Sequence, residues 1–268
     1  MFYYKLKGGL SNMMFGIAGV TALAIENKTQ AIFTNLAEHL KYLNEDNKYN
    51  PSLKHAESYN NLNFIANLHT GTVPKEVTVR YKFPFHYTCT DLKQIPTIVD
   101  GFFQSEKYFV KYRDYMLELF APTSSISKHI DSKYRHITDC KSTSIHVRRG
   151  DYLNLHNHHP ALSETYYHQA MEHMDSETDL YVVFSDDIAW CKNQFTGDKY
   201  IFIEDIDYIE LYMMSMCNNN IIANSSFSWW GAWLNTNTDK TVIGPKNWFG
   251  PSIKHTTEDI LPVEWIKV

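Results

Sequence analysis

Short apolar runs alternate with longer mixed segments through the second half of the chain, as expected where strands alternate with helices. The apolar runs predict strands at residues 143–147, 180–184, 200–203, 220–223 and 241–243. The segments between them predict helices at residues 163–174, 186–192, 206–217 and 226–234. This alternation implies a parallel sheet that helices cover on both faces.

The start of the chain shows a shorter version of the same pattern. A strand at residues 2–6, a helix at 13–25 that Asn12 opens, and a strand at 30–34 form a βαβ-like unit. Residues 37–96 show only weak periodicity, so they receive no assignment.

Helical signals return before the middle of the chain. Ser105 is placed to cap a helix that reaches residue 120, and Pro122 begins another helical segment. We therefore expect an α/β protein with two halves, residues 1–135 and 136–268, joined near residues 132–142.

Composition and charge narrow the class of protein. The chain has 268 residues, of which 44% are hydrophobic and 15% aromatic, which is enough for a large core and excludes a disordered protein. The net charge of -5 argues against a nucleic-acid partner or a membrane-surface protein, since these usually carry a basic face. An anionic ligand would therefore need locally placed cationic or N–H groups.

Cysteine usage and hydropathy favour a cytoplasmic location, including a peripheral one at a membrane. The four cysteines are scattered without a CxxC pair, so we expect reduced thiols. The N-terminus lacks the apolar core of a signal peptide. The sequence contains no run of about 18 or more apolar residues, so we expect no stable insertion into a membrane.

The segment HVRRGDY, residues 146–152, places two arginines directly after a predicted buried strand. A guanidinium group keeps its proton and matches phosphate oxygens with a planar fork. Ligands of open α/β sheets bind at the carboxyl ends of strands, and Gly150 permits close backbone approach. The alternative is that both arginines pair with carboxylates such as Asp151. We expect one arginine to face a ligand and the other to pair with Asp151.

Two further strand ends carry candidate groups. Gly8 and Gly9 precede a helix whose first N–H groups could bind an anion, although a plain tight turn fits equally well. Asp186 and Asp187 could cap a helix, or one of them could accept hydrogen bonds from a nucleobase or ribose. No third ligand at suitable spacing supports a metal at this pair.

A fourth strand end, near residues 221–234, leads into small polar residues and a helix. Its hydroxyl groups and free N–H groups form a second candidate phosphate cradle. The tryptophans here favour core packing, with Trp229 the one that could touch a ligand. His156, His158 and His159 indicate a solvated loop bordering the site rather than a metal centre. The residues thus indicate an enzyme or binder of a nucleotide diphosphate compound, held by Arg148, the Ser225-Ser226 helix start and Asn12.

These motifs, in this order, resemble those of the α-1,2-fucosyltransferases of glycosyltransferase family 11. The matching segments are residues 146–152 (HxRRxDY), 8–18 (G-x-L-G-N-Q-M-F), 104–109 (QSEKYF), 184–192 (FSDDxxWCK) and 224–234 (NSSFSWWGAWL). Ser11 and Met13 depart from the glycine and glutamine of the family's N-terminal segment, so an amide that contacts the donor is lost at position 13.

The resemblance implies a GT-B type fold, with two Rossmann-like domains whose parallel sheets face across a cleft. Residues 1–135 would form the acceptor side and residues 136–268 would bind GDP-β-L-fucose. It implies inverting transfer of L-fucose to a galactose-terminated oligosaccharide in an α-1,2 linkage, with no cofactor and no metal. The remaining alternatives are another linkage, another GDP-sugar, or a non-catalytic module that binds glycans or nucleotides.

The residues and the resemblance together indicate which side chains form the site. In related fucosyltransferases the arginine similar to Arg148 lies against the β-phosphate, which leaves Arg149 to hold Asp151. Asp151 and His146 are both candidates for the general base. The catalytic set is Arg148 and Asp151. The donor-binding set is Gly9, Asn12, His146, Arg148, Arg149, Asp186, Asn224, Ser225, Ser226 and Ser228.

Overall fold

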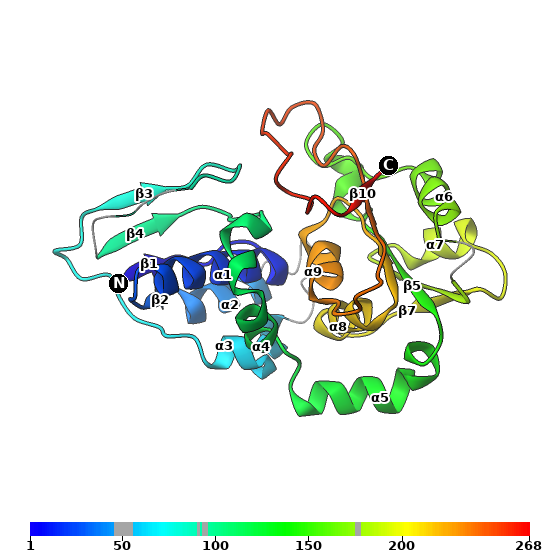
Figure 1. Ribbon diagram of the computed structural model, residues 1–268, viewed down its shortest axis with the longest axis horizontal. Helices are drawn as coiled ribbons and strands as arrows, with labels where there is room; N and C mark the ends of the chain where they lie inside the picture. Colours follow the sequence, from blue (N-terminus) through cyan, green and yellow to red (C-terminus); the bar gives the residue numbers. More distant parts are fainter. Residues whose placement is uncertain (46–55, 90–91, 93–95, 175–177) are drawn as a thin grey trace. The chain divides into compact units, whose positions relative to one another are not determined.

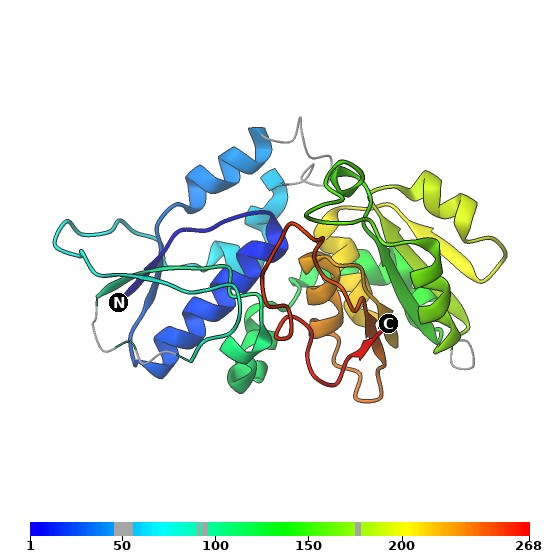
Figure 2. The same cartoon turned by 90° about the horizontal axis from the view of Figure 1, so that it is seen from above.

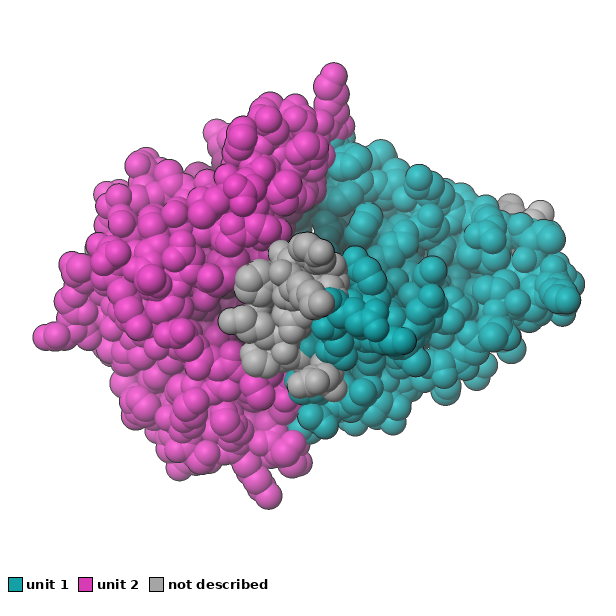
Figure 3. Space-filling view, turned by 180° about the vertical axis from the view of Figure 1, so that it is seen from behind, with its two compact units in different colours: residues 1–49, 53–123, 255–262 teal, residues 50–52, 124–254, 263–268 magenta. Residues whose placement is uncertain are grey.

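The computed structural model describes residues 1–45, 56–89, 92, 96–174 and 178–268. The chain divides into two compact units, which Figure 3 shows in different colours. Unit 1 comprises Met1–Tyr49, Leu53–Thr123 and His255–Pro262, and unit 2 comprises Asn50–Ser52, Ser124–Lys254 and Val263–Val268.

Unit 1 is built on a parallel sheet of four strands in the order β2-β1-β4-β3 (Figure 1). The strands are β1 (Phe2–Tyr4), β2 (Ala31–Phe33), β3 (Arg80–Lys82) and β4 (Thr97–Asp100). The helices are α1 (Leu10–Glu26), α2 (Leu36–Glu45), α3 (Asn63–Ala66) and α4 (Arg113–Leu119), with 3₁₀ helices η3 (Ala56–Asn61), η4 (Glu106–Tyr108) and η5 (Val110–Tyr112). Because α1 is apolar on nearly every side, it is buried along most of its length.

Unit 2 is built on a parallel sheet of six strands in the order β10-β9-β8-β5-β6-β7. The strands are β5 (Ser142–Val147), β6 (Leu180–Ser185), β7 (Tyr200–Ile203), β8 (Asn219–Ile221), β9 (Val242–Gly244) and β10 (Ile266–Lys267). The helices are α5 (Ser124–Thr138), α6 (Glu164–Glu172), α7 (Ile188–Gln194), α8 (Asp207–Met216) and α9 (Ser226–Leu234), with the 3₁₀ helix η6 (Asp151–Asn154).

The order of the strands in unit 2 reverses between β5 and β8. The chain passes from β5 to β6 and β7 on one side and then returns to β8 on the other side of β5. Helices α6 and α7 lie on one face of the sheet and α8 and α9 on the other (Figures 1 and 2). In doubly wound sheets such a reversal opens a crevice at the carboxyl ends of the two strands, where ligands bind.

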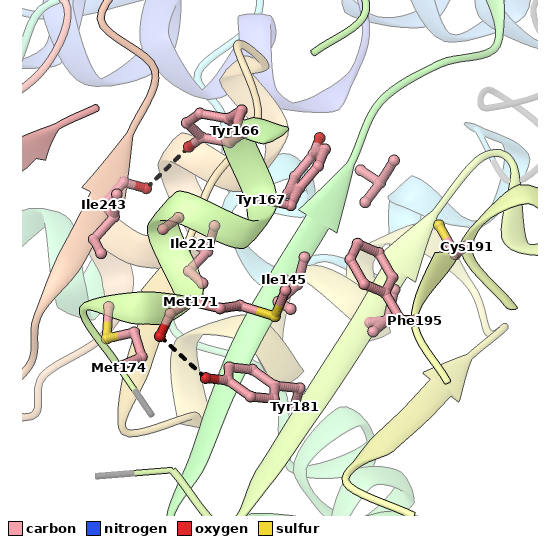
Figure 4. Packing of buried hydrophobic residues seen from close by; sticks show 13 residues of the cluster. Ile145, Tyr166, Tyr167, Met171, Met174, Tyr181, Cys191, Phe195, Ile221 and Ile243 are labelled. Atoms are coloured by element: carbon pink, nitrogen blue, oxygen red, sulfur yellow. Dashed lines mark hydrogen bonds between the residues drawn. The ribbon is translucent and has the colours of Figure 1, made fainter. Parts of the chain in front are cut away.

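One hydrophobic cluster fixes the central strand against α6 and α7 (Figure 4). All six residues of β5 are buried, and Tyr167, Met171 and Phe195 are among the residues packed over this face. Tyr166 donates its hydroxyl hydrogen bond to the carbonyl of Ile222 at 2.5 Å and lies 3.5 Å from that of Ile243. The β8 and β9 ends are thereby held beside β5, which keeps the edge that carries the candidate site rigid.

The predicted α/β class with two parallel sheets is confirmed by the sheets and their helices. Predicted strand 200–203 and helix 226–234 match β7 and α9, and the other predicted elements of unit 2 shift by a few residues. The expected helix from Ser105 to residue 120 is wrong, since η4, η5 and α4 replace it. Phe109 leaves the helical conformation, with φ -140° and ψ -5°, and packs its fully buried ring 6.1 Å from Phe15.

The structural division lies at residues 123 and 124 instead of the expected 135 and 136. Helix α5 belongs to unit 2 because His129, Lys133 and Tyr134 all bind the carboxylate of Asp205 at 2.7 to 3.1 Å. Segment 255–262 returns to unit 1, where the backbone N–H of Tyr87 donates to the carboxylate of Asp259.

None of the four cysteines forms a disulfide bond. Within the described ranges, no helix is long and apolar enough to cross a membrane.

Candidate functional site

Arg148 lies between two carboxylates at the carboxyl end of β5. Its Nη2 donates to Asp151 Oδ1 at 2.7 Å, and its Nη1 lies 3.0 Å from Asp186 Oδ2. The Arg148 side chain is only 14% exposed. Two short ion pairs to partly buried groups fix the guanidinium in one orientation, which favours directional binding over a mobile surface charge.

Arg149 points to a different set of partners. Its Nε donates to Asp187 Oδ2 at 3.0 Å, and its guanidinium lies 4.1 Å from the centre of the Trp190 ring. The expectation that Arg149 holds Asp151 is therefore wrong. Asp151 is instead the first residue of the 3₁₀ turn η6, three residues after Arg148, and pairs with Arg148.

Asp186 ties the two arginines together from the end of β6. Its Oδ1 accepts from the backbone N–H of Arg149 at 2.9 Å, while Oδ2 faces Arg148. A Cβ atom at Gly150 would lie 2.6 Å from that Oδ2, so only glycine fits beside the carboxylate. Asp187 caps α7 by accepting from the N–H of Trp190 at 3.1 Å. Helix capping is confirmed for Asp187, and the alternative that both arginines pair with carboxylates is confirmed. A nucleobase or ribose contact of Asp186 stays a prediction.

The charges of the arginine cluster nearly cancel. Two guanidinium groups, Arg148 and Arg149, face the three carboxylates of Asp151, Asp186 and Asp187. An incoming phosphate must therefore compete with carboxylates for Arg148, which still has N–H groups beyond those bound. Among the described residues, no group of three or more His, Cys, Asp or Glu side chains is arranged to hold a metal ion.

Helix α9 begins beside this cluster in the sheet order, because β8 neighbours β5. Ser225 is the N-cap, and its Oγ accepts from the N–H of Phe227 at 3.3 Å. Ser228 is fully buried and donates to the carbonyls of Ala223 and Ser225. The Ser228 hydroxyl therefore points inward, and the predicted phosphate contact at this end stays a prediction that would use the first N–H groups of α9.

Asn224 has a structural task as well. Its side chain is 1% exposed, and Nδ2 donates to the carbonyls of Pro160 and Trp248 at 3.0 and 3.1 Å. These bonds hold together the loops that follow β5, β8 and β9. Asn224 Oδ1 has no hydrogen-bond partner among the described residues. The donor-binding roles of Asn224 and Ser228 stay predictions.

Tyr152 connects the two strand ends, a role that the sequence did not reveal. Its hydroxyl donates to the carbonyl of Asn224 at 3.2 Å, and the Arg148 guanidinium lies 5.4 Å from its ring centre. Burial raises the pKa of Tyr152 to about 12, so the hydroxyl keeps its proton.

The predicted solvated histidine loop is confirmed for His156 and His158, which are exposed. It is wrong for His159, whose ring stacks on Tyr152 with the ring centres 5.2 Å apart.

His146 lies inside the sheet, two residues before Arg148. It is 5% exposed, and its ring centre is 5.4 Å from that of Phe227. Burial, with a smaller contribution from Arg148, lowers the pKa of His146 to about 3. Its Nδ1 has no hydrogen-bond partner among the described residues. A neutral imidazole of such low basicity is a poor proton acceptor at neutral pH.

Gly9 and Asn12 lie in unit 1, whereas the other predicted site residues lie in unit 2. Gly9 is the N-cap of α1, and Asn12 Oδ1 accepts from Gln104 Nε2 at 2.6 Å. Gln104, the first residue of the QSEKYF segment, thus contacts the first turn of α1. Trp229 is fully buried beside Trp233, so a ligand contact by Trp229 is wrong and the core interpretation is confirmed.

Comparisons with known proteins agree with this arrangement. The O-antigen biosynthesis glycosyltransferase WbnK of Escherichia coli is 30% identical over 94% of this chain and 96% of its own length. An α-1,2-colitosyltransferase of the same organism is 29% identical, covering 98% of this chain and 97% of its own. The crystal structure of the α-1,6-fucosyltransferase NodZ soaked with GDP-fucose superposes with a TM-score of 0.53 at 12% identity, covering 87% of this chain and 92% of NodZ, which shows a shared fold.

The family assignment rests on the whole length of the chain. A family model described as Glycosyl transferase family 11 matches residues 1–268, so that both units and every motif discussed above fall within it. The chain therefore belongs to glycosyl transferase family 11, and the protein is a glycosyltransferase.

Proposed function

We propose that the protein transfers L-fucose from GDP-β-L-fucose to a hydroxyl group of a galactose-terminated oligosaccharide, with inversion, to form an α-1,2 linkage. The observation that carries the proposal is the position of Arg148 and the α9 N-terminus on the two neighbouring strands where the sheet order reverses. A diphosphate leaving group needs positive charge there, and a guanidinium and helix N–H groups supply it.

The proposed transfer assigns a role to each of these groups. The acceptor oxygen attacks the anomeric carbon as the bond from that carbon to the β-phosphate oxygen breaks, and the electron pair stays on the phosphate. Arg148 and the start of α9 stabilise the negative charge that grows on that oxygen. Asp151 and Asp186 hold the guanidinium in place beforehand, which lowers the cost of orienting it during the reaction.

The acceptor proton must go to a base, and two observations support Asp151 over His146. His146 is buried and has a pKa of about 3. The Asp151 side chain is 32% exposed and carries an ion pair at only one oxygen. Asp151 is therefore the base that we assign, because a carboxylate within reach of solvent can also reach a bound hydroxyl group.

A second donor is favoured by one comparison. The relative named α-1,2-colitosyltransferase is similar to this chain over nearly its full length. Colitose is L-fucose without the 3-hydroxyl group, so a site for one sugar differs from a site for the other at a single polar contact. A transferase with a buried partner for that hydroxyl would prefer fucose strongly, since the partner would otherwise remain unpaired.

The test uses the purified full chain with GDP-fucose, GDP-colitose and GDP-mannose, each with lactose as acceptor. We expect GDP release with GDP-fucose and a product whose new linkage is α-1,2 by NMR. Preference for GDP-colitose or GDP-mannose would contradict the donor assignment, and another linkage would contradict the acceptor position. Binding of donor and lactose without turnover would instead identify a non-catalytic module.

A further inference from the structure

Phe102 is an exposed aromatic side chain in the loop that follows β4 in unit 1. It is 41% exposed, whereas its neighbour Phe103 is fully buried. The loop leaves the carboxyl end of a parallel sheet, the edge at which α/β proteins bind ligands. Single exposed apolar residues are ordinary on protein surfaces, and Tyr115, 48% exposed on α4, is one of them. Phe102 differs in how rigidly it is held.

The backbone beside Phe102 has an unusual conformation. Phe103 has φ +54°, in the left-handed region that bulky residues rarely enter. Its ring is anchored in the core, 4.8 Å from the centre of Phe83, and fits against α1 where a Cβ at Gly19 would lie 2.5 Å from it. Such backbone strain persists only where the surroundings impose it, and it concentrates at ligand sites.

Hydrogen bonds fix both ends of this short loop. Tyr4 donates its hydroxyl hydrogen bond to the carbonyl of Gly101 at 2.8 Å, and Gln104 donates to Asn12 at 2.6 Å. Together with the buried Phe103, these bonds leave Phe102 as the side chain that the loop presents to solvent. A rigid aromatic surface binds a ligand without first losing conformational entropy.

Polar groups lie beside the ring of Phe102. Lys7 Nζ is 5.4 Å from the ring centre and forms an ion pair with Asp100, which ends β4. The Lys7 and Asp100 side chains are 32% and 49% exposed, so both can bind a ligand. Since the two charges cancel, the group suits a neutral molecule with hydroxyl groups better than it suits a diphosphate.

We propose that Phe102, Lys7 and Asp100 form a subsite for the galactose ring of the acceptor. The C–H face of β-D-galactopyranose stacks on Phe102, while Asp100 accepts hydrogen bonds from sugar hydroxyls and Lys7 donates to them. Assignment of this sugar to the acceptor rests on the proposed function. Binding of a galactoside here is independent of it.

The test measures lactose binding to the full chain by saturation-transfer NMR and lactose KM in the transfer assay. Phe102→Ala should weaken lactose binding and raise the lactose KM by at least about tenfold, because the stacking surface is lost. Phe102→Tyr should retain binding, and Tyr115→Ala serves as the matched control with unchanged binding. The KM for the donor and the slow hydrolysis of donor without acceptor should remain unchanged in Phe102→Ala.

The outcomes separate this subsite from the proposed function. Lactose binding that depends on Phe102, in a protein that does not turn over GDP-fucose, would leave the subsite standing and overturn the function. Normal transfer with an unchanged lactose KM in a folded Phe102→Ala variant would overturn the subsite and leave the function standing. Absence of lactose binding in the wild type, or equal losses in Phe102→Ala and Tyr115→Ala, would also overturn the subsite.

Discussion

Tyr152 donates a hydrogen bond from its hydroxyl to the backbone carbonyl of Asn224 at 3.2 Å and so joins the loop after β5 to the loop after β8. The same ring lies under the guanidinium of Arg148, 5.4 Å from its central carbon. One side chain therefore positions Arg148 relative to the start of α9. The two groups assigned to the donor's diphosphate come from different strand ends, and this contact sets their separation.

Loss of that hydroxyl should weaken catalysis more than folding. Tyr152→Phe keeps the ring under Arg148 but removes a hydrogen bond worth about 1 kcal/mol, so we expect kcat to fall about fivefold. Steady-state transfer assays and thermal unfolding measure the two effects. Tyr181→Phe removes a buried hydroxyl that donates to the Met171 carbonyl, far along the chain from Arg148, and should leave kcat unchanged. Equal kcat for wild type and Tyr152→Phe would contradict the positioning role.

Gly150 should not tolerate a side chain. The Cβ of Gly150→Ala would lie 2.6 Å from Asp186 Oδ2 and push that carboxylate away from Arg148. We expect kcat to fall at least about tenfold, because misplacement of a charged group by a fraction of an ångström weakens transition-state binding. A crystal structure of the variant should show a longer Arg148 to Asp186 distance. An unchanged pair with full activity would contradict the requirement for glycine, and a longer distance with full activity would show that the Asp186 carboxylate is dispensable.

The pH dependence of stability should carry a contribution from Glu210. Burial raises the pKa of Glu210 to about 8, and the nearby carboxylates of Asp207, Asp205 and Glu204 add to the rise. The folded state then holds the proton more tightly than the unfolded state, whose value is 4.5. The stabilising contribution is complete below the unfolded value and is lost as pH rises from 4.5 to about 8.

Glu210→Gln should remove this dependence, since a neutral amide has no proton to lose. At pH 8 we expect the variant to unfold with a free energy higher than that of the wild type by about 1 to 3 kcal/mol, and the gap should close near pH 5. Urea unfolding across this range measures it. Glu164→Gln, at an exposed carboxylate that is paired with His168, is the control. Parallel pH profiles for wild type and Glu210→Gln would rule out the buried proton.

Transfer should not require a divalent cation. Asp186 and Asp187, the adjacent carboxylates nearest the proposed leaving group, are already bound by Arg148 and Arg149 at 3.0 Å each. Displacing these partners to bind a metal would leave the partly buried guanidinium of Arg149 without its carboxylate and remove one of the two that hold Arg148. We expect an unchanged initial rate after dialysis against EDTA, measured as GDP release. A strict requirement for manganese would identify these two aspartates as metal ligands.

The sequence predicted unit 2 better than unit 1 because its elements are marked by strong local signals. Helix α9 starts where Ser225 caps it, and the apolar run of β7 is bounded by polar residues. Strand β3, with the sequence Arg-Tyr-Lys and mostly exposed side chains, has no apolar alternation to detect. It forms because it pairs with β4, and this pairing is invisible to local patterns.

The partners of the arginines could not be predicted for a related reason. Arg148 and Arg149 are adjacent, so the sequence alone does not show which of them pairs with Asp151. The choice depends on the turn that begins at Asp151 and on the position of Asp187 at the start of α7, both of which are set by tertiary packing. The roles of Tyr152 and Gln104 were missed because their partners, Asn224 and Asn12, lie 72 and 92 residues away.

The most direct measurement compares kcat for fucosyl transfer from GDP-fucose to lactose in Arg148→Lys and Arg149→Lys. Lysine keeps the charge but loses the planar fork, so kcat should fall at least about a hundredfold at position 148, where the leaving diphosphate is bound. At position 149, where the arginine braces Asp187 and Trp190, the fall should stay within about tenfold. Full activity in Arg148→Lys, or an equal loss in both variants, would contradict the assignment of Arg148 to the donor's diphosphate.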